Sequence, residues 1–171
     1  MSLSTAPDPY GVAPSCTSVP NRNPRAELES ARSIILVSDR DRELDPPLPA
    51  VPTVRVAWDG VASCPQLDER LADAHVGVRI VAVGDETLCY SVLSRARAAG
   101  ALDDEVSLII TDRGRLRVFC THCRHTGIHD EAEVGAVVTC AGCARRLVIY
   151  HHFSRRTAAY MGYMVDAEEA A

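Results

Sequence analysis

Residues 78–110 decide the fold: VRIVAVGDETLCYSVLSRARAAGALDDEVSLII. The nearly continuous apolar run at Val78–Val83 predicts a strand. Asp85 is placed to cap a helix over Glu86–Ala99, and the glycine that follows suits the left-handed position that ends helices. A second apolar run predicts another strand over Leu108–Ile110. Strand, helix and strand in about thirty residues form a βαβ unit, and we therefore predict an α/β fold with a small parallel sheet.

Two further strands and a short helix are predicted upstream of this unit. Residues Ser33–Val37 form a continuous apolar run of strand length, which suggests a strand buried on both faces. The proline-rich segment Asp45–Pro52 must be a loop, because proline cannot donate the backbone hydrogen bonds of a helix or sheet. Alternating apolar residues predict a second strand over Thr53–Trp58. Apolar residues at helical spacing predict a short helix over Gln66–Ala74.

Composition and charge restrict the class of protein. The chain has 171 residues, 47% of them hydrophobic, and its formal net charge of −5 provides no overall field that would attract nucleic acid. Its seven cysteines, an odd number, suit a reducing cytosol better than a secreted disulfide framework. No run approaches the ~18 apolar residues of a membrane span, and the N-terminus does not resemble a signal peptide. We therefore expect a cytoplasmic protein without membrane contact.

The sequence pattern divides the chain into four segments. Residues 1–30 hold five of the ten prolines together with many Ser, Thr and Asn, a composition that predicts a disordered tail. Residues 31–113 carry the strands and helices of the α/β domain. Beyond them, short strands around two cysteine pairs predict a zinc-ribbon-like domain over residues 114–165. The acidic, alanine-rich residues 166–171 are expected to fray.

Two Cys-x-x-Cys pairs predict a metal site. They are Cys120-Thr-His-Cys123 and Cys140-Ala-Gly-Cys143. A two-residue gap lets both sulfurs of a pair reach one ion at about 2.3 Å, and two pairs complete a tetrahedron without an open position, so the predicted site is structural. Two disulfides or four free thiols are the alternative, but nothing else indicates an oxidising compartment. Strands are predicted around the pairs over Arg115–Phe119, Gly135–Thr139 and Arg146–Tyr150.

The ligand set suits either of two metals. We predict Zn²⁺, because zinc dominates structural four-cysteine sites, while a rubredoxin-like iron site would use the same cysteines. Neighbouring arginines would offset the negative charge of the centre: Arg117, Arg124, Arg145 and Arg146. Five histidines also lie near the pairs, and without a metalloprotease motif we interpret them as surface hydrogen-bonding residues: His122, His125, His129, His151 and His152.

No active site is evident in the sequence. The turn after the strand at Val78–Val83 has one glycine, Gly84, where a dinucleotide-binding turn needs three. Acidic residues, Asp85 and Glu86, stand where a pyrophosphate would lie. No local motif such as Gly-x-Ser-x-Gly joins nucleophile and base. We therefore predict no catalytic and no cofactor-binding residues, although nucleotide binding by the α/β domain stays open.

Residues Tyr150–Tyr163 hold half of the eight aromatic residues and two adjacent arginines. Tyr, Phe, Met and Arg are enriched in protein interfaces. Two interpretations are equally supported, a partner interface and a core that seals the ribbon against the sheet. The candidate interface residues are His152, Phe153, Arg155, Arg156, Tyr160, Met161 and Tyr163.

Several strings of residues together resemble a known family. They are Val118-Phe-Cys-x-x-Cys123, Val138-Thr-Cys-x-x-Cys143, His152-Phe-Ser-Arg-Arg156 and Ala159-Tyr-Met-Gly162. This combination resembles the C-terminal domain of the small, dimethylamine-monooxygenase-type subunit found with bacterial haem-dependent oxidative N-demethylases. Residues Val81–Glu86 and Arg97–Gly100 resemble the N-terminal domain of the same family. The resemblance covers roughly residues 80–168, about half of the chain.

The resemblance implies an accessory subunit of a three-part enzyme. A haem-containing subunit would oxidise dimethylamine to methylamine and formaldehyde with O2. A reductase subunit with FMN and a 2Fe-2S cluster would supply electrons from a nicotinamide. The haem, FMN and 2Fe-2S groups would belong to these partners only, and the present chain would serve assembly or reductase docking in a hetero-oligomer without nucleic acid.

The βαβ unit is also similar to the last βαβ of the nicotinamide-binding module of ferredoxin-reductase-type enzymes. It departs from that module because Gly84-Asp85 replaces the usual Gly-Pro. Two other functions stay open. A nucleic-acid-binding zinc ribbon is suggested by arginines that cluster in an otherwise acidic chain, and a rubredoxin-like electron carrier would hold iron in the four thiolates.

Overall fold

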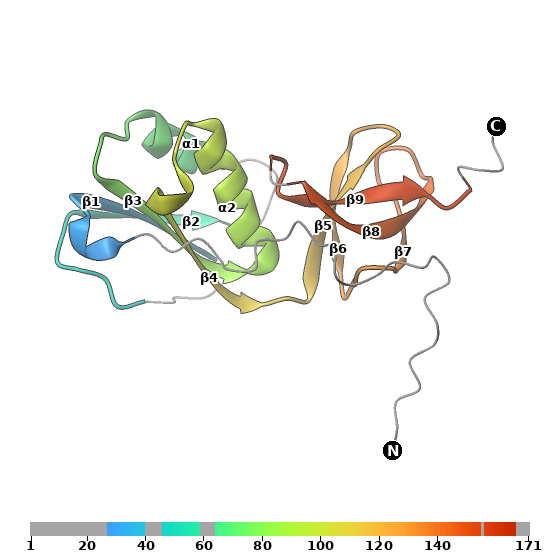
Figure 1. Cartoon of the computed structure of the whole chain (residues 1–171), viewed down its shortest axis with the longest axis horizontal. Coiled ribbons are helices and arrows are strands. Elements are labelled where there is room, and N and C mark those ends of the chain that lie inside the picture. Colours follow the sequence, from blue (N-terminus) through green and yellow to red (C-terminus); the bar gives the residue numbers. More distant parts are fainter. Residues whose placement is uncertain (1–26, 40–45, 59–63, 155, 167–171) are drawn as a thin grey trace, which may run out of the picture.

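The computed structural model describes residues 27–39, 46–58, 64–154 and 156–166. The predicted N-terminal tail, Arg155 and the predicted C-terminal tail therefore lie wholly or largely outside the described residues. The described chain forms a four-stranded sheet A and a five-stranded sheet B, which lie one after the other along the longest axis of the molecule (Figure 1). In this part of the chain, every helix is too short or too polar to cross a membrane.

Sheet A is entirely parallel and confirms the predicted α/β class. Its strands are β1 (Ser33–Asp39), β2 (Thr53–Trp58), β3 (Val78–Asp85) and β4 (Val106–Asp112), in the order β2-β1-β3-β4. Residues 34–37 of β1 are all buried, as the continuous apolar run predicted. Short 3₁₀ turns, η2 (Leu28–Ser30) and η3 (Asp103–Glu105), precede β1 and β4.

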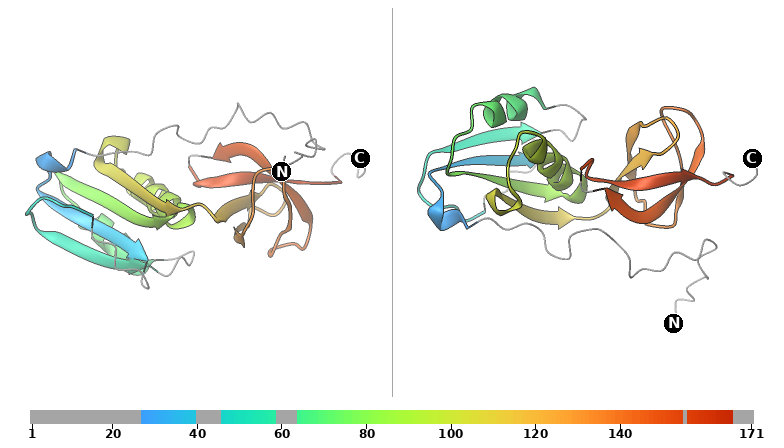
Figure 2. Two further views of the ribbon diagram at one scale, coloured as in Figure 1. Left: turned by 90° about the horizontal axis from the view of Figure 1, so that it is seen from below. Right: turned by 45° about the horizontal axis from the view of Figure 1, so that its top comes forward.

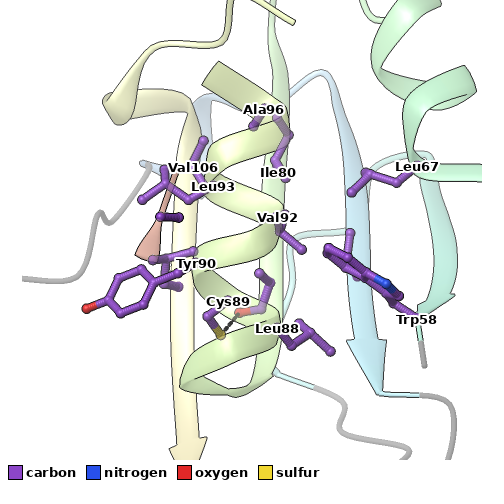
Figure 3. Packing of buried hydrophobic residues seen from close by; sticks show 14 of the residues in the cluster. Trp58, Leu67, Ile80, Leu88, Cys89, Tyr90, Val92, Leu93, Ala96 and Val106 are labelled. Atoms are coloured by element: carbon purple, nitrogen blue, oxygen red, sulfur yellow. Dashed lines mark hydrogen bonds between the residues drawn. The ribbon is translucent and has the colours of Figure 1, made fainter. Parts of the chain in front are cut away.

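Helices α1 (Pro65–Ala72) and α2 (Glu86–Ala98) pack on one face of sheet A (Figure 2). The Asp85 side chain accepts a hydrogen bond from the Leu88 backbone N–H at 2.7 Å, which confirms the predicted N-cap. Gly100, with φ of 95°, follows the helix end as predicted. The buried face of α2 carries Cys89, Val92, Leu93 and Ala96 (Figure 3), and the opposite face of the sheet is covered by Leu28, Leu48 and Val51.

Sheet B has the strand order β6-β5-β9-β8-β7. Its strands are β5 (Arg115–Cys120), β6 (Thr126–Asp130), β7 (Val137–Thr139), β8 (Arg146–Ser154) and β9 (Ala159–Met164). Only β5 and β9 pair in parallel. The sequence predicted β5, β7 and the first half of β8 but not β6 or β9. Central strand β9 needs Gly162, because a Cβ atom there would lie 2.8 Å from Val118 Cγ1.

The two sheets share one hydrophobic core. Phe153 of β8 lies against Tyr90 of α2, with ring centroids 4.8 Å apart, and against Tyr160 of β9. Polar contacts reinforce this junction, since Thr87 Oγ1 donates to the carbonyl of Arg115 at 2.9 Å, and the Arg115 guanidinium lies 3.0 Å from the Asp85 carboxylate. The proposed domain boundary near residue 114 thus falls between β4 and β5, and the core continues across it.

Candidate metal centre

The structure brings the four predicted cysteines together. The Sγ atoms of Cys120, Cys123, Cys140 and Cys143 all lie within 4.8 Å of one another. Across the two pairs, Cys120 Sγ is 3.9 Å from Cys143 Sγ, and Cys123 Sγ is 3.6 Å from Cys140 Sγ. A tetrahedron with metal–sulfur bonds of about 2.3 Å has sulfur–sulfur edges of about 3.8 Å. The four sulfurs therefore have the spacing of a metal site, and all four cysteines are free rather than disulfide-bonded.

The two cysteine turns have the same backbone structure. Cys120 donates its N–H to the carbonyl of His125 at 2.8 Å, and Cys140 donates to that of Arg145 at 2.9 Å. The residue after the second cysteine of each pair is left-handed: Arg124 has φ of 64° and Ala144 has φ of 57°. Each turn therefore presents its two sulfurs in the same way, and a single ion between the turns would join them.

The turns meet at Gly142, inside the second pair. A Cβ atom on Gly142 would lie 2.7 Å from His125 Cβ and 3.2 Å from Cys123 Sγ, so only glycine allows this approach. On the inner side, Cys120 and Cys140 are buried against Leu147. On the outer side, Cys123 is exposed and Cys143 is half-buried. The centre thus lies at the surface of sheet B, a feature that cysteine spacing alone did not predict.

The thiols influence one another's ionisation. Although burial raises the pKa of Cys140, hydrogen bonds from the backbone N–H groups of Gly142 and Cys143 lower it to about 7. The His125 backbone N–H lowers the pKa of Cys123, but desolvation and the other three thiols raise it to about 12. Four thiols so close cannot all ionise without a cation between them. Metal uptake should therefore release protons.

Replacing Ala144 with glycine is expected to stabilise the protein. A non-glycine residue in the left-handed region carries strain that glycine lacks, and we expect the free energy of unfolding to rise by about 0.5–1 kcal/mol. Urea unfolding of the metal-loaded protein measures this difference. Ala141→Gly is the matched control, because Ala141 is exposed in the same turn without a positive φ. A gain at position 141 equal to that at 144 would contradict the explanation.

The arginines and histidines near the centre have different positions. Arg124, Arg145 and Arg146 are exposed. Arg117 instead donates to the Ser91 hydroxyl of α2, and burial together with Arg95 lowers its pKa, so it belongs to the junction between helix and sheet. Among the described residues, the four cysteines form the one cluster of at least three His, Cys, Asp or Glu ligands that could hold a metal ion.

The N-terminus of α2, where a nucleotide phosphate would bind in related folds, is occupied by the chain itself. Asp85 caps the helix and also pairs with Arg115. Glu86 is buried beneath sheet B, and this burial raises the pKa of its carboxyl group. The carboxylates of Asp85 and Glu86, together with Arg115 of β5, therefore occupy the position at the helix N-terminus where a phosphate would bind.

The candidate interface residues divide into two groups. Phe153 and Tyr160 are buried in the junction core, which agrees with the second of the two interpretations of this segment. His152, Arg156 and Tyr163 are exposed, and Met161 is half-buried. Arg155 lies outside the described residues.

Met161 and Tyr163 lie on the side of sheet B that faces away from the core. Alternate residues of a strand face opposite sides, and the register places Phe119 beside Met161, and Val137 and Val148 in line with Tyr163. Tyr150 packs edge-on against Tyr163, with ring centroids 5.5 Å apart. We call this apolar side the outer face of sheet B, where Val148 is buried and the other residues are half-buried or exposed: Phe119, Val137, Val148, Tyr150, Met161 and Tyr163. The candidate interface residues did not include Phe119, Val137, Val148 or Tyr150. Only the register of the strands places these residues beside Met161 and Tyr163.

Comparisons with known proteins find similarity over the segment that holds the four cysteines. A family model described as dimethylamine monooxygenase subunit DmmA-like, C-terminal domain, matches residues 117–163, which include all four cysteines. The heme-dependent oxidative N-demethylase delta subunit of Ectopseudomonas mendocina (strain ymp) is 37% identical over 103 residues, 60% of this chain and 57% of that protein. The chain thus matches somewhat more than half the length of this curated relative. No solved structure matches the chain significantly.

These comparisons confirm the resemblance to the small subunit of haem-dependent N-demethylases. They lend no support to the similarity with ferredoxin-reductase modules, since no solved structure of that kind matches.

Proposed function

We propose that this chain is a non-catalytic, zinc-stabilised subunit of a haem-dependent oxidative N-demethylase complex. One observation carries the proposal: the segment that matches the family, residues 117–163, is also the segment that gathers four cysteine sulfurs within 4.8 Å. Its partners would be a haem-containing subunit, which oxidises dimethylamine, and a flavin and iron–sulfur reductase. Haem, FMN and the 2Fe-2S cluster would reside in these partners, in the cytoplasm.

The donor set fits a structural Zn²⁺. Cys120, Cys123, Cys140 and Cys143 would hold the ion, and four thiolates leave no position for water or substrate. Bound zinc would supply a cross-link between the two cysteine turns. The hydrophobic cluster beside the cysteine turns is small. Apart from cysteines, it consists of Leu147 and the partly buried Val138 and Met164. A small core of this kind depends on such a cross-link for stability.

The outer face of sheet B is the surface we assign to the haem-containing subunit. Tyr163 is 40% exposed and Val137 is 38% exposed, although both are large apolar residues. Tyrosine and methionine side chains on a sheet face are typical of interface centres. Exposed Arg145 and Arg146 lie at the end of the sheet that holds the cysteine turns and would favour an acidic rim on the partner.

Replacing Tyr163 with aspartate should disrupt the complex. A charge at the centre of a desolvated interface typically costs 2 kcal/mol or more, so retention of the haem subunit should fall at least about tenfold. Co-elution on size exclusion, followed at the Soret absorption, measures retention. Val54→Asp is the matched control, since Val54 is 39% exposed on β2 of sheet A. Equal retention of Tyr163→Asp and the control, with metal content unchanged, would contradict the assignment of this face.

A rubredoxin-like electron carrier is a second candidate function. The exposed Cys123 and half-buried Cys143 favour it, because a redox metal at the surface can exchange electrons with a partner. Iron in the four thiolates would give a red, redox-active protein. A colourless, zinc-loaded sample would remove this candidate.

A further inference from the structure

The four cysteines of the candidate metal centre differ in their access to solvent. The structure describes six cysteines, all of them free, and of these six only Cys123 is exposed. Cys143 is half-buried, whereas Cys120 and Cys140 are 1% and 3% exposed. Cysteine oxidation follows thiolate character and exposure. An oxidant in the solvent would therefore reach Cys123 before the other described cysteines.

A second thiol lies within reach of this exposed sulfur. Cys140 Sγ is 3.6 Å from Cys123 Sγ, and the two residues belong to different turns. A Cβ atom at Gly142 would lie 3.2 Å from Cys123 Sγ, so the absence of a side chain at Gly142 leaves the sulfur uncovered on that side. Redox-sensor cysteines are solvent-accessible and often lie next to a second, resolving cysteine. Cys123 and Cys140 meet both conditions.

We propose that Cys123 is a peroxide-reactive thiol, and that Cys140 resolves its oxidised form into a disulfide between the two turns. The reactant is hydrogen peroxide. The inference rests on the four-cysteine centre of the proposed function, but it does not depend on the haem-containing partner. It adds a modification site to a centre whose other role is structural.

The reaction consumes one peroxide for each disulfide. The Cys123 thiolate attacks one oxygen of H2O2, so that an S–O bond forms, the O–O bond breaks and hydroxide leaves. The Cys140 thiolate then attacks the sulfur of the resulting sulfenic acid, so that the S–S bond forms, the S–O bond breaks and a second hydroxide leaves. Two thiolates thus lose two electrons, and the peroxide gains them.

This disulfide would exchange one cross-link for another. Only Cys120 and Cys143 would remain as ligands, so the metal ion would be released. The disulfide still joins the two turns, whereas a disulfide within either cysteine pair would leave the turns separate. We therefore expect oxidised sheet B to stay folded without metal, and we expect a thiol reductant with Zn²⁺ to restore the centre.

Partial oxidation of the zinc-loaded full chain tests which cysteine reacts first. Cys16 is replaced by serine in every sample, because it lies outside the described residues. The chain receives less peroxide than protein in the presence of dimedone, which traps sulfenic acids. We expect several-fold more label on Cys123 than on any other cysteine. The buried Cys64 and Cys89 are internal controls and should stay reduced.

Peptide mapping without reductant then tests the connectivity. Trypsin cleaves after Arg124, which lies between the two cysteine pairs, so Cys123 and Cys140 fall in different peptides. A disulfide between the turns joins these peptides, whereas a disulfide within a pair does not. We expect joined peptides whose fragments assign the bond to Cys123 and Cys140, with loss of about one zinc per peroxide consumed. Hydrogen-exchange protection of β5–β9 should persist.

The outcomes separate this inference from the proposed function. Metal content is measured before peroxide is added, so a chain that binds no zinc is recognised at that step. The labelling and the peptide map report on the sulfurs themselves and decide the present inference in either case. Absence of reaction, first labelling of another cysteine, separate peptides, or loss of protection in β5–β9 after oxidation would overturn it.

Discussion

Replacing Cys140 with serine is expected to abolish metal binding and to unfold sheet B. The serine hydroxyl does not replace a thiolate as a zinc ligand. Structural zinc contributes on the order of 10–16 kcal/mol of apparent binding energy in small zinc-binding peptides, which equals or exceeds the whole stability of an ordinary domain. Because Cys140 is 3% exposed and packs on Leu147, the loss would also disturb the interior of the sheet.

Metal analysis and residue-level hydrogen exchange measure this result together. We expect zinc content to fall from about one ion per chain to none, and the amides of β5–β9 to lose protection while those of sheet A keep it. Cys64→Ser is the control, because Cys64 is a buried thiol at the N-cap of α1, where serine is itself favourable. Loss of protection in both sheets at once would mean that residues 31–113 do not form a separate folding unit.

Replacing Phe153 with alanine is expected to be the most destabilising change at the junction. The Phe153 side chain is 2% exposed and lies between Tyr90 of α2 and Tyr160 of β9, at centroid distances of 4.8 and 5.1 Å. Removing a buried phenylalanine ring typically costs about 3–5 kcal/mol, because the cavity closes only partly. Urea unfolding followed by tyrosine fluorescence measures the loss.

The neighbour of Phe153 supplies the control for this experiment. His152 is exposed, and His152→Ala should change the free energy of unfolding by no more than about 0.5 kcal/mol. If Phe153→Ala left stability unchanged but prevented association with the haem subunit, Phe153 would be an interface residue rather than a core residue.

Local signals in the sequence predicted the parallel sheet and the four clustered cysteines. Each of these signals lies within a short stretch of sequence. The signals are the helix cap at Asp85, the apolar run at Ser33–Val37 and the two-residue gaps of the cysteine pairs. These features can be recognised without knowledge of the rest of the fold. The ferredoxin-reductase similarity rests on the same local pattern and stays a prediction, because no solved structure matches the chain significantly.

Sheet B depends on long-range pairing, which the sequence does not show. Strand β9 pairs in parallel with β5, so that Gly162 lies beside Cys120, far earlier in the chain. Its residues read Ala-Tyr-Met-Gly-Tyr-Met, apolar on both faces, and nothing local indicates that Tyr160 points inward while Tyr163 points outward. The two interpretations of residues 150–163 could therefore be separated only by the register, which assigns some of these residues to the core and others to the outer face.

The central claim, a zinc-containing accessory subunit, is tested most directly by purifying the tagged chain gently from its native host. Its absorption spectrum and metal content are then recorded on the same sample. We predict larger co-purifying subunits with a Soret band and about one zinc per copy of this chain. A colourless, zinc-bound chain without a haem-containing partner would contradict the proposed function, and iron in the isolated chain would identify an electron carrier instead.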